Sequence, residues 1–279
     1  MTESEVAPTV TLANGVAMPA IGLGTWPMDD AKAEVLIPRA IAAGYRLFDT
    51  AENYGNESGV GRGIRASGIA RDEVFVTSKF NARWHGFKET QEAFANSAER
   101  LGLDRIDMLL IHWPNPSQDR YVDAWRGLIQ LLHDGKISVL GVSNFKPAHI
   151  DRLIDATGVA PHVNQVQLNP RVGRGAERLY HAEHGIVTET WGPLGQGGAL
   201  LEEPAITTAA RHHGKTPAQV VLCWHVQLGL IPIPRTLNPS RLSENIDVFD
   251  FALSAEEIDA ISALDRNGEG AADSDRIGH

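Results

Sequence analysis

Short apolar runs alternate with longer amphipathic stretches along most of the chain. The runs are rich in Val, Ile and Leu and have the length of strands buried on both faces: Leu47–Phe48, Val74–Thr77, Met108–Ile111, Val139–Val142, Val163–Val166 and Ile186–Val187. The stretches repeat apolar residues every three or four positions, which is typical of helices: Ala31–Ala43, Ser58–Ser67, Glu89–Leu101, Val122–His133, Pro147–Ala156 and Ala176–His184. Strands that alternate with helices indicate parallel βαβ units.

Counting strands from Ile21 to Leu230–Ile233 gives eight, which predicts an α/β fold, a (β/α)8 TIM barrel. Before the first of them, Thr9–Leu12 and Val16–Met18 flank an Asn-Gly pair, so we expect an N-terminal β-hairpin. The alternative is an open doubly wound sheet, which would carry a G-x-G-x-x-G fingerprint after its first strand. The segment that begins at Gly22 has a proline at the third glycine position, so the barrel is favoured.

Composition limits the class of protein. Apolar residues make up 43% of the 279 residues and charged residues 22%, which excludes a disordered chain, and no composition break divides residues 1–279, so we expect a single domain. The net charge of −10 argues against a nucleic-acid partner, and the chain has no apolar run long enough to cross a membrane. The acidic N-terminus does not resemble a signal peptide, and one cysteine permits no internal disulfide. We therefore expect a cytoplasmic protein and, without a heptad pattern, a monomer.

The acidic residues are unevenly distributed. Between Pro204 and Ser243 the chain has no Asp or Glu, although about five would be expected from the average. Arg235 and Arg241 lie in this segment, after the last strand, where barrels commonly bind phosphate. The helix that Pro239 begins would add free N–H groups at its N-terminus, so we expect an anion site here.

Polar residues follow four of the predicted strands. Asp49, Lys79, His112 and the pair Ser143-Asn144 recur at intervals of about one βα unit. The carboxyl ends of all barrel strands face the same mouth, so these side chains should meet.

Their chemistry suits proton donation to a carbonyl oxygen. Tyr54 follows Asp49 by five residues, and a phenol is a weak acid unless its pKa is lowered. The Lys79 ammonium should lower that pKa, Asp49 should orient Lys79, and His112 could share the proton or bond the substrate oxygen. Trp26, Trp113 and Trp191 follow strands, and Trp84 follows Lys79, so all four indoles are expected around the same pocket.

Five segments resemble the aldo-keto reductase superfamily in the family's own order: Gly44–Glu57, Ile111–Pro114, Gly141–Phe145, Val163–Gln165 and Arg235–Asn245. Two more, Trp191–Gly197 and His213–Gln219, are most similar to its bacterial 2,5-diketo-D-gluconate reductase branch. The resemblance covers nearly the whole chain.

The resemblance implies NADPH-dependent reduction of aldehydes and ketones such as small carbonyls, dicarbonyls or keto sugar acids. Tyr54 would be the general acid, with Asp49, Lys79 and His112 completing a tetrad. The nicotinamide end of the cofactor would be bound by Ser143, Asn144 and Gln165 at the carboxamide and by Trp191 at the ring. A loop that runs to Gly198 would also contact the cofactor through Gly192, Leu194, Gly195 and Gly197. The other end would be bound by Arg235, Thr236 and Arg241 at the 2′-phosphate and by Glu244 and Asn245 at the adenine. Trp26, Trp84 and Trp113 would contact substrate.

Other functions fit the sequence less well. The main alternative is a non-catalytic barrel that binds NADPH as a sensor or structural subunit. A glycosidase would need paired carboxylates, and only Asp49 and perhaps Glu189 are available. The pairs His181/His184 and His212-His213 have no evident third metal ligand, so no metal is expected. The short Gly/Asp-rich segment after Leu264 predicts no extended tail over the substrate, and hence loose specificity.

Overall fold

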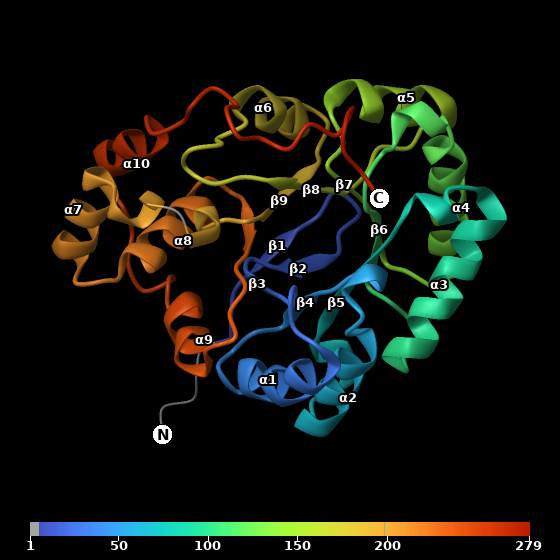
Figure 1. Cartoon of the computed structure of the whole chain (residues 1–279), viewed down its shortest axis with the longest axis horizontal. Coiled ribbons are helices and arrows are strands. Elements are labelled where there is room, and N and C mark those ends of the chain that lie inside the picture. Colours follow the sequence, from blue (N-terminus) through green and yellow to red (C-terminus); the bar gives the residue numbers. More distant parts are fainter. Residues whose placement is uncertain (1–5, 198) are drawn as a thin grey trace.

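Eight parallel strands form a ring in the computed structural model, which describes residues 6–197 and 199–279 (Figure 1). Their bounds are β3 Gly22–Gly24, β4 Leu47–Asp49, β5 Phe75–Phe80, β6 Met108–Ile111, β7 Val139–Ser143, β8 Val163–Gln167, β9 Val187–Trp191 and β10 Ile231–Ile233. The Gly24 amide donates to the Pro234 carbonyl at 3.0 Å, which brings the first strand back to the last. The predicted (β/α)8 barrel is confirmed, and the open sheet is wrong.

Helices surround the ring (Figure 1). In chain order they are α1 Asp30–Ala42, α2 Glu57–Ser67, α3 Phe87–Leu101, α4 Tyr121–His133, α5 Pro147–Thr157, α6 Gly175–Glu183, α7 Pro204–His213, α8 Pro217–Gln227, α9 Pro239–Ile246 and α10 Ala255–Ser262. Within residues 6–197 and 199–279, none of the helices combines the length and the apolarity that a bilayer crossing requires.

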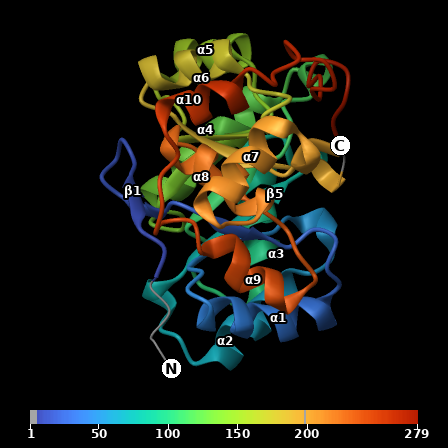
Figure 2. The same cartoon turned by 90° about the vertical axis from the view of Figure 1, so that its left-hand side faces the viewer.

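The predicted N-terminal hairpin closes one end of the barrel. Strand β1, Thr9–Thr11, pairs antiparallel with β2, Ala17–Pro19. Leu12 and Met18 are buried in a cluster with the first residues of several barrel strands: Leu47, Phe75, Met108, Val139, Val163 and Ile231. This apolar plug leaves the opposite end of the barrel for a site, and Figure 2 shows the hairpin and the C-terminus on opposite sides of the molecule. Residues 1–5 of the acidic N-terminus lie outside the described residues.

Strand β9 is longer than its apolar run predicted. It extends from Val187 to Trp191 because its three central polar residues are all hydrogen-bonded inside the protein. Thr188 bonds His181 of α6 at 2.8 Å, Thr190 contacts His225 of α8 at 3.3 Å, and Glu189 bonds the neighbouring strand β8. Polar residues that find hydrogen-bond partners inside the protein hide a buried strand from a search for apolar runs.

The segment after α10 corrects the expectation that no tail reaches the substrate mouth. It runs back across the barrel to end near β6 and β7 (Figure 1). Lys146, just before α5, pairs with Asp273 at 2.6 Å and Asp275 at 2.5 Å. The His279 carbonyl then accepts a hydrogen bond from the Ala82 amide at 3.1 Å, so the short tail is attached at the mouth.

Candidate active site

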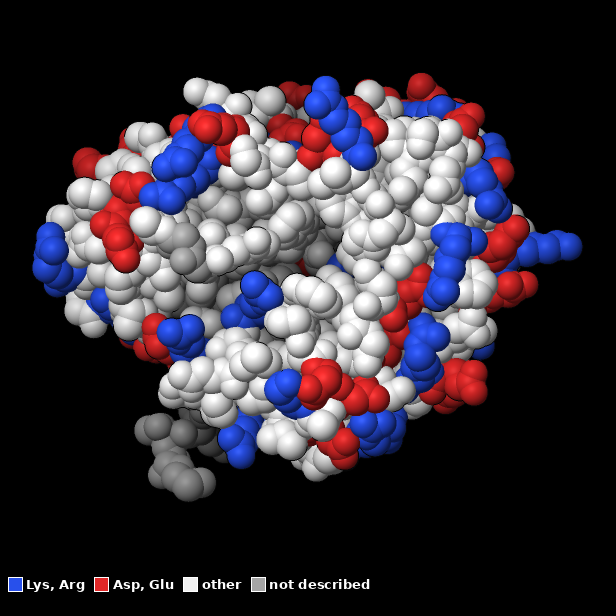
Figure 3. Space-filling view, viewed as in Figure 1, with Lys and Arg blue, Asp and Glu red and all other residues white. Residues whose placement is uncertain are grey.

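A cavity of about 590 Å³ lies at the carboxyl ends of the strands, where Figure 3 shows the surface hollowed. Many of the predicted site residues line it: Trp26, Asp49, Tyr54, His112, Trp113, Ser143, Asn144, Gln165, Trp191, Gly192, Leu194, Arg235 and Arg241. They come from the ends of different strands and from the loops that follow them. The register of the parallel ring therefore brings together residues that are far apart in the sequence.

A buried ion pair lies beneath this cavity. Lys79, in β5, is 0% exposed, and its Nζ lies 2.5 Å from Oδ1 of Asp49, the last residue of β4. The same Nζ donates to the Thr50 carbonyl at 3.0 Å and lies 3.4 Å from the Tyr54 hydroxyl. Tyr54 ends the 3-10 turn Glu52–Tyr54 that follows β4. One ammonium therefore connects the predicted carboxylate to the predicted phenol.

The pKa values of these groups follow from their burial. Burial alone would lower the pKa of Lys79, but Asp49, with smaller contributions from Tyr54 and Glu189, raises it, and the pKa lies above its usual value. Burial raises the pKa of Tyr54, and the Lys79 charge opposes that rise only in part. The expectation that Lys79 brings the pKa of Tyr54 below its usual value is therefore wrong for this structure. Tyr54 holds its proton firmly at neutral pH.

His112 follows β6 and borders the same space. Burial and the Lys79 charge lower its pKa well below the usual value, so the imidazole is neutral. Its Nδ1 lies 3.2 Å from the Asn81 side-chain oxygen, and its ring meets the Tyr54 ring edge-on with 6.0 Å between centroids. A neutral imidazole in this place can orient a polar substrate atom, but it does not supply a positive charge.

A chain of amide hydrogen bonds forms one wall of the cavity. Gln165 Nε2 donates to Asp49 Oδ2 at 2.8 Å and to Glu189 Oε2 at 2.6 Å. Asn144 Nδ2 donates to the His112 carbonyl at 3.1 Å, while its oxygen accepts from the Trp191 indole at 2.9 Å. These bonds fix the predicted carboxamide-binding residues on the same framework as the ion pair.

The cavity lining also carries positive charge. Arg235 and Arg241 both line it, and neither guanidinium is ion-paired with a carboxylate among the described residues. Helix α9 begins beside them at Pro239, after the Asn238 cap. Two guanidinium groups without carboxylate partners, next to a helix N-terminus, suit an anion such as a phosphate.

Several predicted site residues do not line the cavity. The Trp84 indole donates to Glu52 at 2.7 Å and packs against the core, so the structure does not bring it to the proposed substrate. Glu244 accepts a hydrogen bond from Thr216 at 2.8 Å instead of facing the cavity. Three other predicted cofactor residues also lie off the lining: Gly195, Thr236 and Asn245. Gly198, at the end of the loop that begins at Gly192, is outside the described residues.

The cavity also includes residues that the sequence did not indicate: Asn53, Gln196, Leu201 and His279. Asn53 could have been found as the neighbour of Tyr54. No local signal marks His279, whose ring lies 4.7 Å from the His112 ring only because the tail returns to the mouth. The two remaining tryptophans, Trp125 and Trp224, are buried in helices α4 and α8 and belong to the hydrophobic core.

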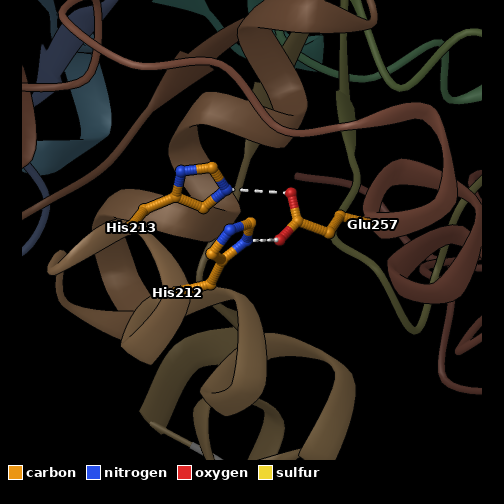
Figure 4. Close-up of side chains that lie close together, drawn as sticks. All are labelled: His212, His213 and Glu257. Atoms are coloured by element: carbon orange, nitrogen blue, oxygen red, sulfur yellow. Dashed lines mark hydrogen bonds and ion pairs between the residues drawn. The ribbon is translucent and has the colours of Figure 1, made fainter.

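His212 and His213 gain a third partner that the sequence did not reveal. Glu257 of α10 lies 2.9 Å from His212 Nδ1 and 2.8 Å from His213 Nε2 (Figure 4). These three groups could hold a metal, but the Glu257 carboxylate also caps its own helix by accepting from the Ser254 amide at 2.9 Å. Both carboxylate oxygens therefore already accept hydrogen bonds, and we interpret the three residues as a structural contact that links α7 to α10.

Comparison with known proteins gives consistent matches. The family model described as "Aldo/keto reductase family" matches residues 20–266. The chain is 49% identical to 2,5-diketo-D-gluconic acid reductase B of Corynebacterium sp. (strain SHS752001) over 93% of this chain and 94% of that protein. It is 44% identical to methylglyoxal reductase DkgA of Yersinia pestis, over 92% of this chain and 93% of that protein.

Solved structures agree with the sequence matches. A mutant of Gox0644 in complex with NADPH is 41% identical, with a TM-score of 0.94 over 99% of this chain and 100% of that chain. Bombyx mori aldo-keto reductase in complex with NADP is 33% identical, with a TM-score of 0.87 over 94% of each chain.

Proposed function

The chain belongs to the aldo/keto reductase family and is an NADP-dependent oxidoreductase, and from this premise we propose that it reduces small aldehydes and ketones with Tyr54 as the proton donor. The substrates we propose are small carbonyls, dicarbonyls and keto sugar acids. The single observation that carries the proposal is the buried Lys79 Nζ, which lies 2.5 Å from Asp49 and 3.4 Å from the Tyr54 hydroxyl.

The residues of the cavity fit NADPH. Arg235 and Arg241 would hold the 2′-phosphate, because both line the cavity without a carboxylate partner among the described residues. Gln165, Ser143 and Asn144 would bind the carboxamide, and Trp191 would contact the nicotinamide ring. The bound cofactor would supply a hydride to the carbonyl carbon.

Tyr54 would protonate the oxygen of the same carbonyl. Its raised pKa keeps the proton on the phenol until negative charge develops on the substrate oxygen. The Lys79 ammonium would then stabilise the phenolate that remains, and Asp49 keeps Lys79 charged and oriented. Neutral His112 would orient the carbonyl oxygen, while Trp26 and Trp113 would wall the substrate space.

The test is a panel of carbonyl compounds with NADPH and NADH side by side. We expect NADPH consumption that depends on an aldehyde or on a dicarbonyl such as methylglyoxal, and much slower consumption of NADH. Tight NADPH binding with no turnover on any carbonyl would instead favour a non-catalytic cofactor-binding barrel.

We also propose that the chain acts as one domain, as a monomer and in the cytoplasm. The uniform composition supports one domain, the lack of a heptad pattern supports a monomer, and the single cysteine supports the cytoplasm. Sedimentation at micromolar concentration tests the oligomeric state.

A further inference from the structure

A second carboxyl group, Glu189, is buried inside the barrel beneath the cavity. Thr188 and Thr190 on either side of it bond helices α6 and α8, so they point outward. Because side chains alternate along a strand, Glu189 and Trp191 point inward. Trp191 lines the cavity, which places the 0%-exposed Glu189 one layer below.

The two carboxyl oxygens of Glu189 differ in their hydrogen bonding. Its Oε2 accepts from Gln165 Nε2 at 2.6 Å, whereas its Oε1 is buried without a hydrogen-bond partner among the described residues. The same Gln165 amide also bonds Asp49, so two carboxyl groups share one amide. Lys79 is the cation of this cluster, and Asp49 is already paired with it at 2.5 Å.

A second carboxylate would therefore give the buried cluster a net negative charge. Burial raises the pKa of Glu189 to about 8, and the Asp49 charge adds to that rise, while Gln165 and Lys79 oppose it. The protonated form of Glu189 is favoured at neutral pH.

The positive charge of an oxidised nicotinamide would change this balance. The reduced nicotinamide lacks that charge, and Gln165, our proposed ligand of its carboxamide, is bonded directly to Glu189. We propose that Glu189 is a positioning residue that couples cofactor redox state to one proton: it stays protonated under NADPH and releases a proton to solvent when NADP⁺ binds. This inference rests on the proposed function.

The other charged and titratable groups around Glu189 do not account for such a proton. Lys79 from β5 and Tyr54 after β4 have raised pKa values, so both stay protonated near neutral pH. Asp49 from β4 is held in its ion pair with Lys79. On the other side, β10 places the uncharged Ile231 opposite Glu189.

The coupling predicts a definite pH dependence of binding. If NADP⁺ binding releases one proton, its affinity rises by up to about tenfold per pH unit until free Glu189 is itself ionised, and then levels off. NADPH affinity should not show this rise. Both cofactors carry the same 2′-phosphate, whose proton titrates near pH 6, so the ratio of their dissociation constants removes that contribution.

The experiment measures both dissociation constants by quenching of tryptophan fluorescence between pH 6 and 9. The proteins are the full chain and its Glu189→Gln, Glu183→Gln and Tyr54→Phe variants. Glutamine mimics protonated Glu189 and keeps an oxygen for Gln165, whereas Glu183 is exposed on α6 and serves as the matched control. We expect the ratio of NADP⁺ affinity to NADPH affinity to rise at least about fivefold from pH 6 to 8 in wild type, in Glu183→Gln and in Tyr54→Phe. The ratio should stay flat in Glu189→Gln.

A ratio that is flat in wild type, or that still rises in Glu189→Gln, overturns the inference, and so does loss of the rise in Tyr54→Phe. If Glu189→Gln weakens the binding of both cofactors equally and the affinity ratio still rises with pH, the role of Glu189 is purely structural. If Glu189→Gln does not fold, calorimetry of wild type in two buffers of different ionisation enthalpy decides, because it must show proton release with NADP⁺ near pH 7. Failure of the proposed function is distinct, because it would appear as no carbonyl-dependent consumption of NADPH by wild type, whether or not the affinity ratio changes with pH.

Discussion

Single residues of the site act through what lies buried beside them. Lys79 remains charged at zero exposure because Asp49 lies 2.5 Å away, and the same charge reaches the Tyr54 hydroxyl. The recurrence of polar residues after strands predicted this meeting of side chains from the sequence. It could not predict the pKa direction of Tyr54, which depends on burial, nor the role we propose for Glu189 in mid-strand.

At the same scale, Arg241→Gln should weaken NADPH binding about 10- to 100-fold, because hydrogen bonds to charged groups contribute about 1.5–3 kcal/mol. NADH lacks the 2′-phosphate, so its dissociation constant should change little. Fluorescence titration of both cofactors measures the effect. Arg211→Gln, in the same acid-free segment but away from the cavity lining, is the control. Equal loss for NADH would refute the phosphate role of Arg241.

Among the elements, close packing of helices was the least visible feature of the sequence. Helix α2 carries Gly59, Gly61 and Gly63, and a Cβ at Gly61 would collide with the backbone carbonyl of Leu101 at the end of α3. The first two of these glycines resemble a dinucleotide fingerprint, yet here they let α2 approach α1 and α3. Element types were predictable from apolar periodicity, whereas the predicted length of β9 was too short because its internally bonded threonines interrupt the apolar run.

Gly61→Ala should therefore lower the free energy of unfolding by about 1–3 kcal/mol, the usual cost of overpacking. Urea unfolding followed by circular dichroism measures the change. Gly175→Ala is the matched control, because a Cβ there would meet open space at the start of α6. Unchanged stability of the Gly61 variant would show that α2 can shift at little cost.

On the scale of the whole molecule, charge and topology complement each other. The net charge of −10 describes the surface, while the acid-free segment delivers Arg235 and Arg241 to the cavity. The acid-free segment is visible in the sequence, and the alternation of apolar runs with amphipathic stretches predicted the barrel. It did not predict the return of the tail, because the pairing of Lys146 with Asp273 and Asp275 joins parts of the chain that only the fold brings together.

Replacing both tail partners, Asp273→Asn with Asp275→Asn, should release His279 from the mouth. We expect faster hydrogen exchange over residues 273–279 and a rise of about fivefold in the KM for a small carbonyl, which corresponds to about 1 kcal/mol of lost contact. NADPH affinity should stay within error. Asp155→Asn, an exposed carboxylate on α5, controls for the loss of charge. A protected tail in the double variant would contradict the assigned attachment.

The central claim is that Tyr54 donates the proton, and Tyr54→Phe tests it most directly when turnover and NADPH binding are measured on the same preparation. The account predicts a fall in kcat with methylglyoxal of about 10²- to 10⁴-fold, the contribution of a general acid, with the NADPH dissociation constant nearly unchanged. Turnover close to wild type in a variant that still binds NADPH would contradict it.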